Sequence, residues 1–250
     1  MDKNAIRDKL INFAENDAEK VMKEESQDWE EDKDPNEYPL EFVLRVIFDE
    51  HIRWELAWAA PDELRNRLGH LDVNKIAQID ESELKKIMST PKALHPYVNK
   101  MPRQIIRACK FIVDRYNGDA RQIWKGSLYA KDIENRFDEI PQIGQKKASM
   151  AVNMLVRDYG IPILDKERQG IDVSYDIHVR RVFIRTGLVD NDSLDEVIKA
   201  AQVLNPQYPG ALDYPAWVIG QKWCKKTNPL CSDCILASVC PKLLTRSVPE

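Results

Sequence analysis

The sequence predicts an all-α protein, and three observations support this fold class. Short apolar stripes recur at helical spacing along the 250 residues, and glycine is scarce, at 9 residues. No segment alternates apolar and polar residues in the way that a half-buried strand does. A chain of this length can bury a substantial core, and we expect one large domain or two interlocked domains.

The expected helices follow from their apolar faces, taken in chain order. A stripe over residues 6–21 marks the first helix, and the acidic segment from Glu24 to Glu37 is expected to be an exposed linker. Apolar residues from Leu40 to Ala60 predict a helix that ends before Pro61. A longer helix is predicted from Pro102, which suits a first helical turn, to Tyr116.

Four of the five cysteines fall within one short segment, with the spacing C-x6-C-x2-C-x5-C. Thiols this close together cannot all form disulfides without strain. A structural zinc site usually has two C-x2-C pairs, whereas here only Cys231 and Cys234 form one, between the outer Cys224 and Cys240. The pattern therefore favours an iron–sulfur cluster, with zinc as the alternative. The fifth cysteine, Cys109, lies on an apolar stripe and is predicted to belong to the core.

The net charge of −4 conceals an uneven distribution along the chain. Residues 1–60 carry 8 basic and 17 acidic side chains, a balance of −9, whereas residues 91–160 carry 13 basic and 7 acidic side chains, a balance of +6. Because electrostatic footprints are local, the basic middle of the chain permits phosphate binding. A solvated charged face explains this balance equally well.

The segment from Phe137 to Ala148 is predicted to join two helices through a very short turn. A continuous apolar face from Ala148 to Tyr159 marks the second of these helices. The backbone N–H groups at its start have no partner within the helix, so they form a ready site for a phosphate oxygen. Gly144 in the turn would let a ligand approach the backbone closely.

This turn resembles the helix-hairpin-helix of the DNA glycosylase superfamily that includes endonuclease III, which reads hydrophobic-Pro-Gly-hydrophobic-Gly-x-Lys. The sequence departs from it at Gln142, where the family has glycine and where the amide side chain could itself reach a phosphate. It matches the pattern at Ile140, Pro141, Ile143, Gly144 and Lys146.

The resemblance implies that Lys146 is the nucleophile of bifunctional family members and that Lys147 contacts a phosphate. A lysine in the first turn of a helix lies near the positive end of the helix dipole, which lowers its pKa and favours the neutral amine. Such an amine can attack C1′ of a deoxyribose. On the residues alone, two phosphate-contacting lysines remain the alternative.

Asp176 is expected at the N-cap of a helix within the segment from Tyr175 to Val182. On the residues alone, capping the helix amides explains this aspartate. The segment resembles the family's stretch with the catalytic aspartate, which implies that Asp176 stabilises the cationic sugar and helps to deprotonate Lys146 or a water. The connection between the two residues is longer than in typical family members, and it contains Asp172 as a competing carboxylate.

The cysteine spacing is the one found in the endonuclease III branch, and the resemblance runs from about residue 40 to 241. It implies a [4Fe-4S] cluster, and we expect the cluster to shape a loop whose lysines face phosphates. The implied cluster ligands are Cys224, Cys231, Cys234 and Cys240, and the expected phosphate-facing lysines are Lys222, Lys225 and Lys226. Many family members place a glutamine in an early loop near the DNA, where this sequence reads Phe48-Asp49-Glu50-His51.

The resemblance also implies a division into two helical domains. Residues 40–160 would form a six-helix barrel domain, with the helix-hairpin-helix at about 131–158. Residues 1–39 plus 161–250 would form a second helical domain that carries the cluster loop.

The implied function is that of a DNA glycosylase in base-excision repair, with associated β-elimination lyase activity at abasic sites. It would extrude a damaged or mismatched base from double-stranded DNA. Two alternatives remain, a monofunctional glycosylase in which Asp176 activates water and a non-catalytic DNA-binding module. Oxidised pyrimidines are the default substrate by likeness, while oxidised purines and mismatched bases stay open. Because clustered free thiols need a reducing compartment, we expect a cytoplasmic, nucleoid-associated monomer without membrane contact.

Overall fold

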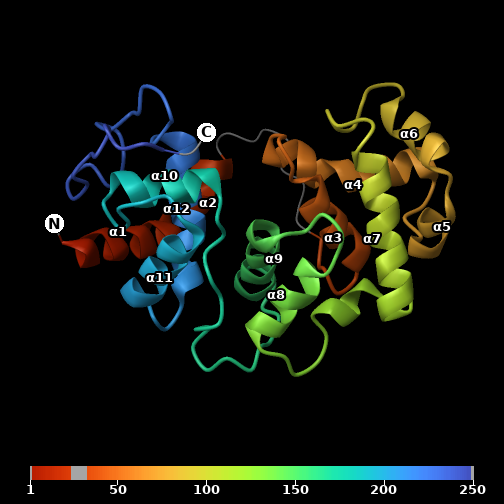
Figure 1. Cartoon of the computed structure of the whole chain (residues 1–250), viewed down its shortest axis with the longest axis horizontal. Coiled ribbons are helices and arrows are strands. Elements are labelled where there is room, and N and C mark those ends of the chain that lie inside the picture. Colours follow the sequence, from red (N-terminus) through yellow and green to blue (C-terminus); the bar gives the residue numbers. More distant parts are fainter. Residues whose placement is uncertain (1, 24–32, 249–250) are drawn as a thin grey trace. The chain divides into compact units, whose positions relative to one another are not determined.

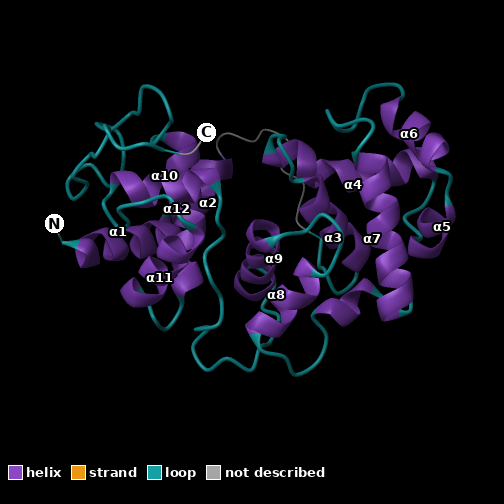
Figure 2. Ribbon diagram, in the orientation of Figure 1, coloured by secondary structure: helices purple, strands orange, loops and turns teal. Residues whose placement is uncertain are grey.

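The computed structural model describes residues 2–23 and 33–248, and its regular structure there is helical, with no strand (Figure 2). The predicted all-α fold class is confirmed. The described residues form two compact units, one of residues 33–163 and one of residues 2–23 with 164–248 (Figure 1). The expected acidic linker falls largely on residues 24–32, which lie outside the described residues. Within the described ranges, no helix is both long and apolar enough to cross a membrane.

The unit of residues 33–163 is built around one helix that is buried on almost every side. Nine of the ten residues of α3 are buried, and all of these are apolar except Glu41 and Arg45. Phe42 on this helix packs edge-on against Trp124 at 5.7 Å, and Trp124 stacks on Phe137 at 6.1 Å between ring centroids. The helices of this unit are α3 (Pro39–Phe48), α4 (Trp54–Leu68), α5 (Val73–Gln78), α6 (Glu81–Ser89), α7 (Met101–Tyr116), α8 (Ala130–Asp138) and α9 (Gln145–Arg157).

The prediction of a single helix from Leu40 to Ala60 is wrong, because a loop separates α3 from α4. Glu50 donates its backbone N–H to the carbonyl of Phe48 at 2.7 Å, and His51 has a φ of +53°, so the helix cannot continue. Pro61 lies inside α4 rather than after its end. The break places Asp49 and Glu50 in a loop at the C-terminal end of α3.

The predicted helix-hairpin-helix is confirmed as α8, a six-residue turn and α9. Ile140 and Ile143 of the turn are 1% and 4% exposed, so the turn is anchored in the core of its unit. The Ser149 hydroxyl donates to the Glu134 carboxylate at 3.0 Å and ties the two helices together. Gln142 takes the left-handed conformation, with a φ of +76°, at the position where the family turn has glycine.

The other unit joins the N-terminal helices to the C-terminal part of the chain. Phe13 packs against Trp223 at 5.8 Å, and the ammonium of Lys3 donates to the carbonyl of Leu188 at 3.0 Å. An added Cβ at Gly220 would lie 2.6 Å from Cβ of His178. Glycine is therefore required where the helix that contains Gly220 crosses the helix that contains His178. The helices are α1 (Lys3–Asn16), α2 (Ala18–Lys23), α10 (Ile177–Arg185), α11 (Leu194–Leu204) and α12 (Asp213–Lys222).

Candidate functional site

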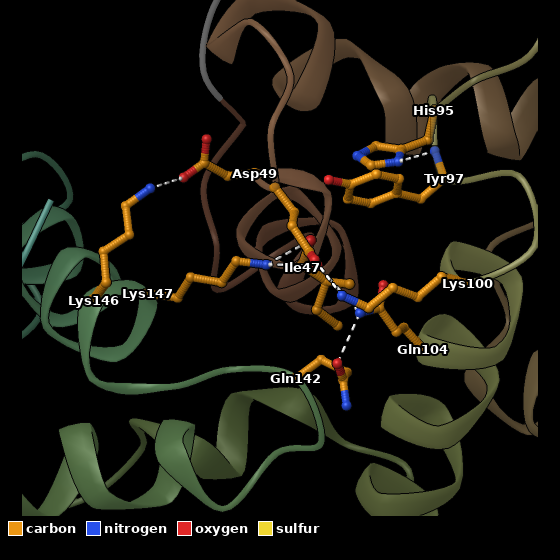
Figure 3. A network of polar contacts seen from close by, with 10 residues as sticks. Ile47, Asp49, His95, Tyr97, Lys100, Gln104, Gln142, Lys146 and Lys147 are labelled. Atoms are coloured by element: carbon orange, nitrogen blue, oxygen red, sulfur yellow. Dashed lines mark hydrogen bonds and ion pairs between the residues drawn. The ribbon is translucent and has the colours of Figure 1, made fainter. Parts of the chain in front are cut away.

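Lys146 lies in the first turn of α9, directly after the hairpin, and its side chain is about one third exposed, at 36%. Its Nζ lies 3.0 Å from Oδ2 of Asp49, in the loop that follows α3 (Figure 3). Asp49 is itself 16% exposed, so this ion pair is partly shielded from water. The predicted nucleophile is therefore at the unit's surface and is restrained by a carboxylate.

Lys147 points in a different direction from its neighbour and is buried, at 7% exposed. Its ammonium donates to the carbonyl of Ile47 at 2.8 Å (Figure 3). It also lies 3.8 Å from Oε2 of Glu50. Burial lowers the pKa of Lys147 to about 8, against the opposing effect of Glu50 and Asp49. This position does not support the predicted phosphate contact, because an interior ammonium is not presented to DNA. Lys147 instead caps the C-terminal end of α3.

Glu50, in the loop after α3, connects Lys147 of α9 to two residues of the α7 region. Its carboxylate pairs with Lys100 and accepts from Nε2 of Gln104 at 3.1 Å. Burial alone would raise the pKa of Glu50, but Lys100, Gln104 and Lys147 outweigh it, and the pKa is lowered. The same Gln104 amide donates to Oε1 of Gln142 at 2.9 Å (Figure 3).

Two residues of this network were missed as site residues by the sequence analysis. The resemblance implies a glutamine in this early loop, so it predicts no role for Asp49 and Glu50. The sequence does contain one signal for them. Two adjacent carboxylates directly follow a largely apolar run, and two adjacent lysines occur later in the chain. Only the fold shows which carboxylate meets which lysine.

Asp176 is the N-cap of α10, as predicted, and it is buried, at 6% exposed. Its Oδ1 accepts from the backbone N–H of His178 at 2.7 Å. His178 in turn contacts the guanidinium of Arg181 through Nδ1 at 2.7 Å. The competing carboxylate, Asp172, accepts from Nε2 of Gln202 at 2.8 Å, which ties it to α11. Asp176 and Lys146 belong to different units, and their joint role stays a prediction.

The four clustered cysteines line one cavity, and Cys109 lies apart from them in the core with its pKa raised to about 12 by burial. Within the described ranges, no three His, Cys, Asp or Glu side chains are close enough to hold a single metal ion. Four cysteine thiols around one cavity are a donor set that an iron–sulfur cluster or a zinc ion can use.

Arg185 provides a second indication of the group that this cavity suits. It is 4% exposed, and its Nη1 lies 3.6 Å from the sulfur of Cys224. Among the described residues, its buried Nε has no hydrogen-bond partner. A buried cation with an unsatisfied donor beside four thiols suits an anionic cluster.

The predicted phosphate-facing lysines lie at the end of α12 and in the segment that follows it. Lys222 is half-buried, whereas Lys225 and Lys226 are exposed. The guanidinium of Arg185 donates to the carbonyls of Lys225 at 2.5 Å and of Lys226 at 2.8 Å. The backbone of the two exposed lysines is thus held from inside the protein, while their side chains face outward.

Comparison with known proteins agrees with this fold. The chain is 27% identical over 144 residues to endonuclease III of Buchnera aphidicola subsp. Baizongia pistaciae, which is 57% of this chain and 56% of that protein. It is 24% identical over 172 residues to endonuclease III of Synechocystis sp., covering 68% of this chain and 67% of that protein. The first match thus spans little more than half of the curated relative.

Solved structures match over nearly the whole chain. A trapped covalent intermediate of endonuclease III with DNA aligns with a TM-score of 0.68 and 20% identity, covering 97% of each chain. A thermostable thymine-DNA glycosylase aligns with a TM-score of 0.65 and 13% identity, covering 98% of each chain. At these identities the likeness establishes the fold. A family model described as the HhH-GPD superfamily base excision DNA repair protein matches residues 44–207, and the chain belongs to this superfamily.

Proposed function

We propose that this protein is a DNA glycosylase of base-excision repair with an associated lyase activity at abasic sites. The observation that carries the proposal is the position of Lys146, in the first turn of α9 and directly after the hairpin, with a partly exposed ammonium. A lysine there can approach a sugar while the start of the helix binds the neighbouring phosphate.

Lys146 acts as the nucleophile once its amine is neutral. The nitrogen lone pair forms a bond to C1′ of the deoxyribose, and the electrons of the N-glycosidic bond leave with the base, which takes up a proton. Asp176 stabilises the positive charge that develops on the sugar and accepts the proton that the amine loses. The C1′–O4′ bond then breaks and O4′ takes up a proton, which opens the sugar ring and gives a Schiff base between Lys146 and C1′. Loss of a proton from C2′ expels the 3′ phosphate, and water hydrolyses the Schiff base to release the enzyme.

The phosphate backbone is bound by the hairpin. Gly144 lies exposed at the N-cap of α9, where its residue type provides no capping side chain and no atom lies within 4 Å of an added Cβ. The fold itself does not require a glycine there, whereas the close approach of a phosphate does. The exposed Gln142 borders the same turn. Lys222, Lys225 and Lys226 add further phosphate contacts from the other unit.

A [4Fe-4S] cluster bound by Cys224, Cys231, Cys234 and Cys240 would supply structure rather than chemistry to this reaction. The residues of the chain act around it. Arg185 orders the segment with Lys225 and Lys226 through their carbonyls, so that the two side chains point outward. DNA affinity is therefore expected to depend on this segment, whereas the chemical step of base excision is not expected to depend on it.

Borohydride trapping on a duplex with one abasic site tests the lyase assignment. We expect a covalent protein–DNA adduct with the natural protein and none with Lys146→Ala. Lys131→Ala, which removes an exposed lysine on α8, is the matched control and should trap normally. Equal trapping by Lys146→Ala would refute Lys146 as the nucleophile.

A monofunctional glycosylase is the second candidate, and one observation favours it. The ion pair with Asp49 stabilises the charged form of Lys146, which is not nucleophilic. In this case Asp176 activates a water, Lys146 binds phosphate, and base release occurs without strand cleavage or trapping. A panel of duplexes that carry oxidised pyrimidines, oxidised purines or mismatches, assayed for base release and for strand cleavage separately, distinguishes the two candidates and identifies the excised base.

A further inference from the structure

The contact between Asp49 and Lys146 joins two segments that are 97 residues apart in the sequence. Asp49 stands at the C-cap of α3, a helix whose position is fixed because it is buried on almost every side. Lys146 stands in the first turn of α9. The carboxylate is therefore held on a rigid support, and it constrains the end of a long, rotatable side chain.

Several other charges face this pair from the elements around it. Glu50 lies beside Asp49 in the same loop, Lys147 follows Lys146 on α9, and Lys100 lies at the N-cap of α7. The mutual influence of these groups is reflected in Lys147, whose pKa responds to Glu50, Asp49, Lys146 and Lys100. Among these named groups two carboxylates face three ammonium groups, and the loss of the carboxylate that contacts Lys146 changes the charge around it.

We propose that Asp49 is a positioning residue for Lys146, which directs the amine and determines the pH above which it becomes neutral. This inference rests on the proposed role of Lys146 in the reaction. In this role Asp49 acts through the lysine that it contacts. In the DNA-free protein it keeps the amine protonated and in one place, and the amine becomes reactive when its proton passes to solvent and the pair separates.

The variant Asp49→Asn isolates this effect. Asparagine has the same shape, and its amide oxygen still accepts a hydrogen bond from the ammonium, so the geometry is kept while the charge is removed. Lys146 would then lose the negative charge of its Asp49 partner, which favours the neutral amine. We expect the pH profile of Schiff-base trapping to move to lower pH by about one unit.

The matched control is Asp158→Asn, which makes the same charge change at the other end of α9. Asp158 pairs with Arg157 at 2.6 Å. Twelve residues separate it from Lys146, roughly 18 Å along a helix, which is about two screening lengths at physiological salt. Its trapping profile should coincide with that of the natural protein.

Single-turnover trapping on abasic DNA across a pH series is the first measurement. At a pH below both midpoints, Asp49→Asn should trap about tenfold faster than the natural protein, and at high pH the rates should converge. A profile of Asp49→Asn that coincides with the natural one, or lies at higher pH, would overturn the inference.

Trace acetylation of the DNA-free protein with acetic anhydride, followed by mass spectrometry of the Lys146 peptide, is the second measurement and requires no activity. The midpoint of Lys146 labelling should fall by the same amount in Asp49→Asn. If the natural protein fails to trap DNA but the labelling midpoint still moves, the proposed function fails and the pairing stands. If trapping occurs and neither midpoint moves, the inference fails alone.

Discussion

Replacing the buried Lys147 by methionine should change how stability depends on pH. The ordinary lysine pKa of 10.5 falls to about 8 in the folded protein. This shift of roughly 2.5 units corresponds to about 3 kcal/mol of preference for the neutral amine, at 1.36 kcal/mol per unit. Methionine has a similar volume and no charge, so Lys147→Met removes this titration while the site remains filled.

The sign of the effect follows from proton binding in the two states. Below about pH 8 both the folded and the unfolded chain hold the proton, so the difference in unfolding free energy between the two proteins is constant. Between about pH 8 and pH 10.5 the unfolded chain holds the proton and the folded protein releases it. The natural protein therefore gains about 3 kcal/mol relative to Lys147→Met as pH rises through this window.

Near pH 7 two effects oppose each other in this variant. The charged lysine is costly to bury, but its hydrogen bond to the carbonyl of Ile47 contributes about 1.5–3 kcal/mol. The two proteins should therefore differ by less than about 2 kcal/mol near neutrality. A strongly destabilised variant at this pH would mean that the hydrogen bond outweighs the desolvation of the ammonium.

Urea unfolding followed by tryptophan fluorescence, at several pH values, measures this difference. Other titrating groups are shared by the two proteins, so subtracting one unfolding free energy from the other isolates Lys147. Lys110→Met, at an exposed position on α7, is the matched control and should give a flat difference. A flat or falling difference for Lys147→Met would refute the interpretation of Lys147 as a buried ammonium with a lowered pKa.

Three further predictions concern the hairpin and the segment from Lys222 to Cys240, which we call the cluster segment. Gly144→Ala should leave the thermal midpoint nearly unchanged, because its Cβ has open space, yet weaken DNA binding by about tenfold; unchanged affinity in a titration at fixed salt would contradict the role of Gly144 in phosphate binding. Gln142→Gly should be about 1 kcal/mol more stable to urea than Gln142→Ala, because both lose the bond to Gln104 and only alanine keeps the left-handed strain; equal stability would argue against that strain. Replacing Lys222, Lys225 and Lys226 together by alanine should reduce the salt slope of DNA binding by up to about 2.7, and an unchanged slope would remove them from the interface.

Local patterns were sufficient to predict much of the fold. The stripe of α7 and the face of α9 are strongly periodic. α7 begins and ends within one residue of its predicted bounds, and α9 begins three residues before the predicted face and ends two residues before Tyr159. The break after α3 was missed because Trp54 and Ala57 continue the apolar spacing across it, and Asp49 and Glu50 are compatible with a helix. Their ion pairs with lysines far along the chain stabilise the loop, and such long-range pairs leave no local signal.

The site shows the same distinction between local and long-range information. Asp176 as a helix cap follows from its own segment, and the structure places it there. The different surroundings of Lys146 and Lys147 depend on the rotation of α9 about its axis. Lys147 lies four and eight residues before the buried Ala151 and Leu155, so helical spacing places it on the buried face. That signal was present in the sequence, but the adjacent pair of lysines suggested two solvent-facing cations.

The most direct test of the account is the identity of the residue that becomes attached to DNA. The natural protein would be reduced with borohydride on abasic duplex DNA, digested with nuclease and protease, and analysed by mass spectrometry. The account predicts that the sugar remnant is attached to Lys146 alone. A remnant on Lys147, on the N-terminal amine or on a lysine of the cluster segment would contradict it.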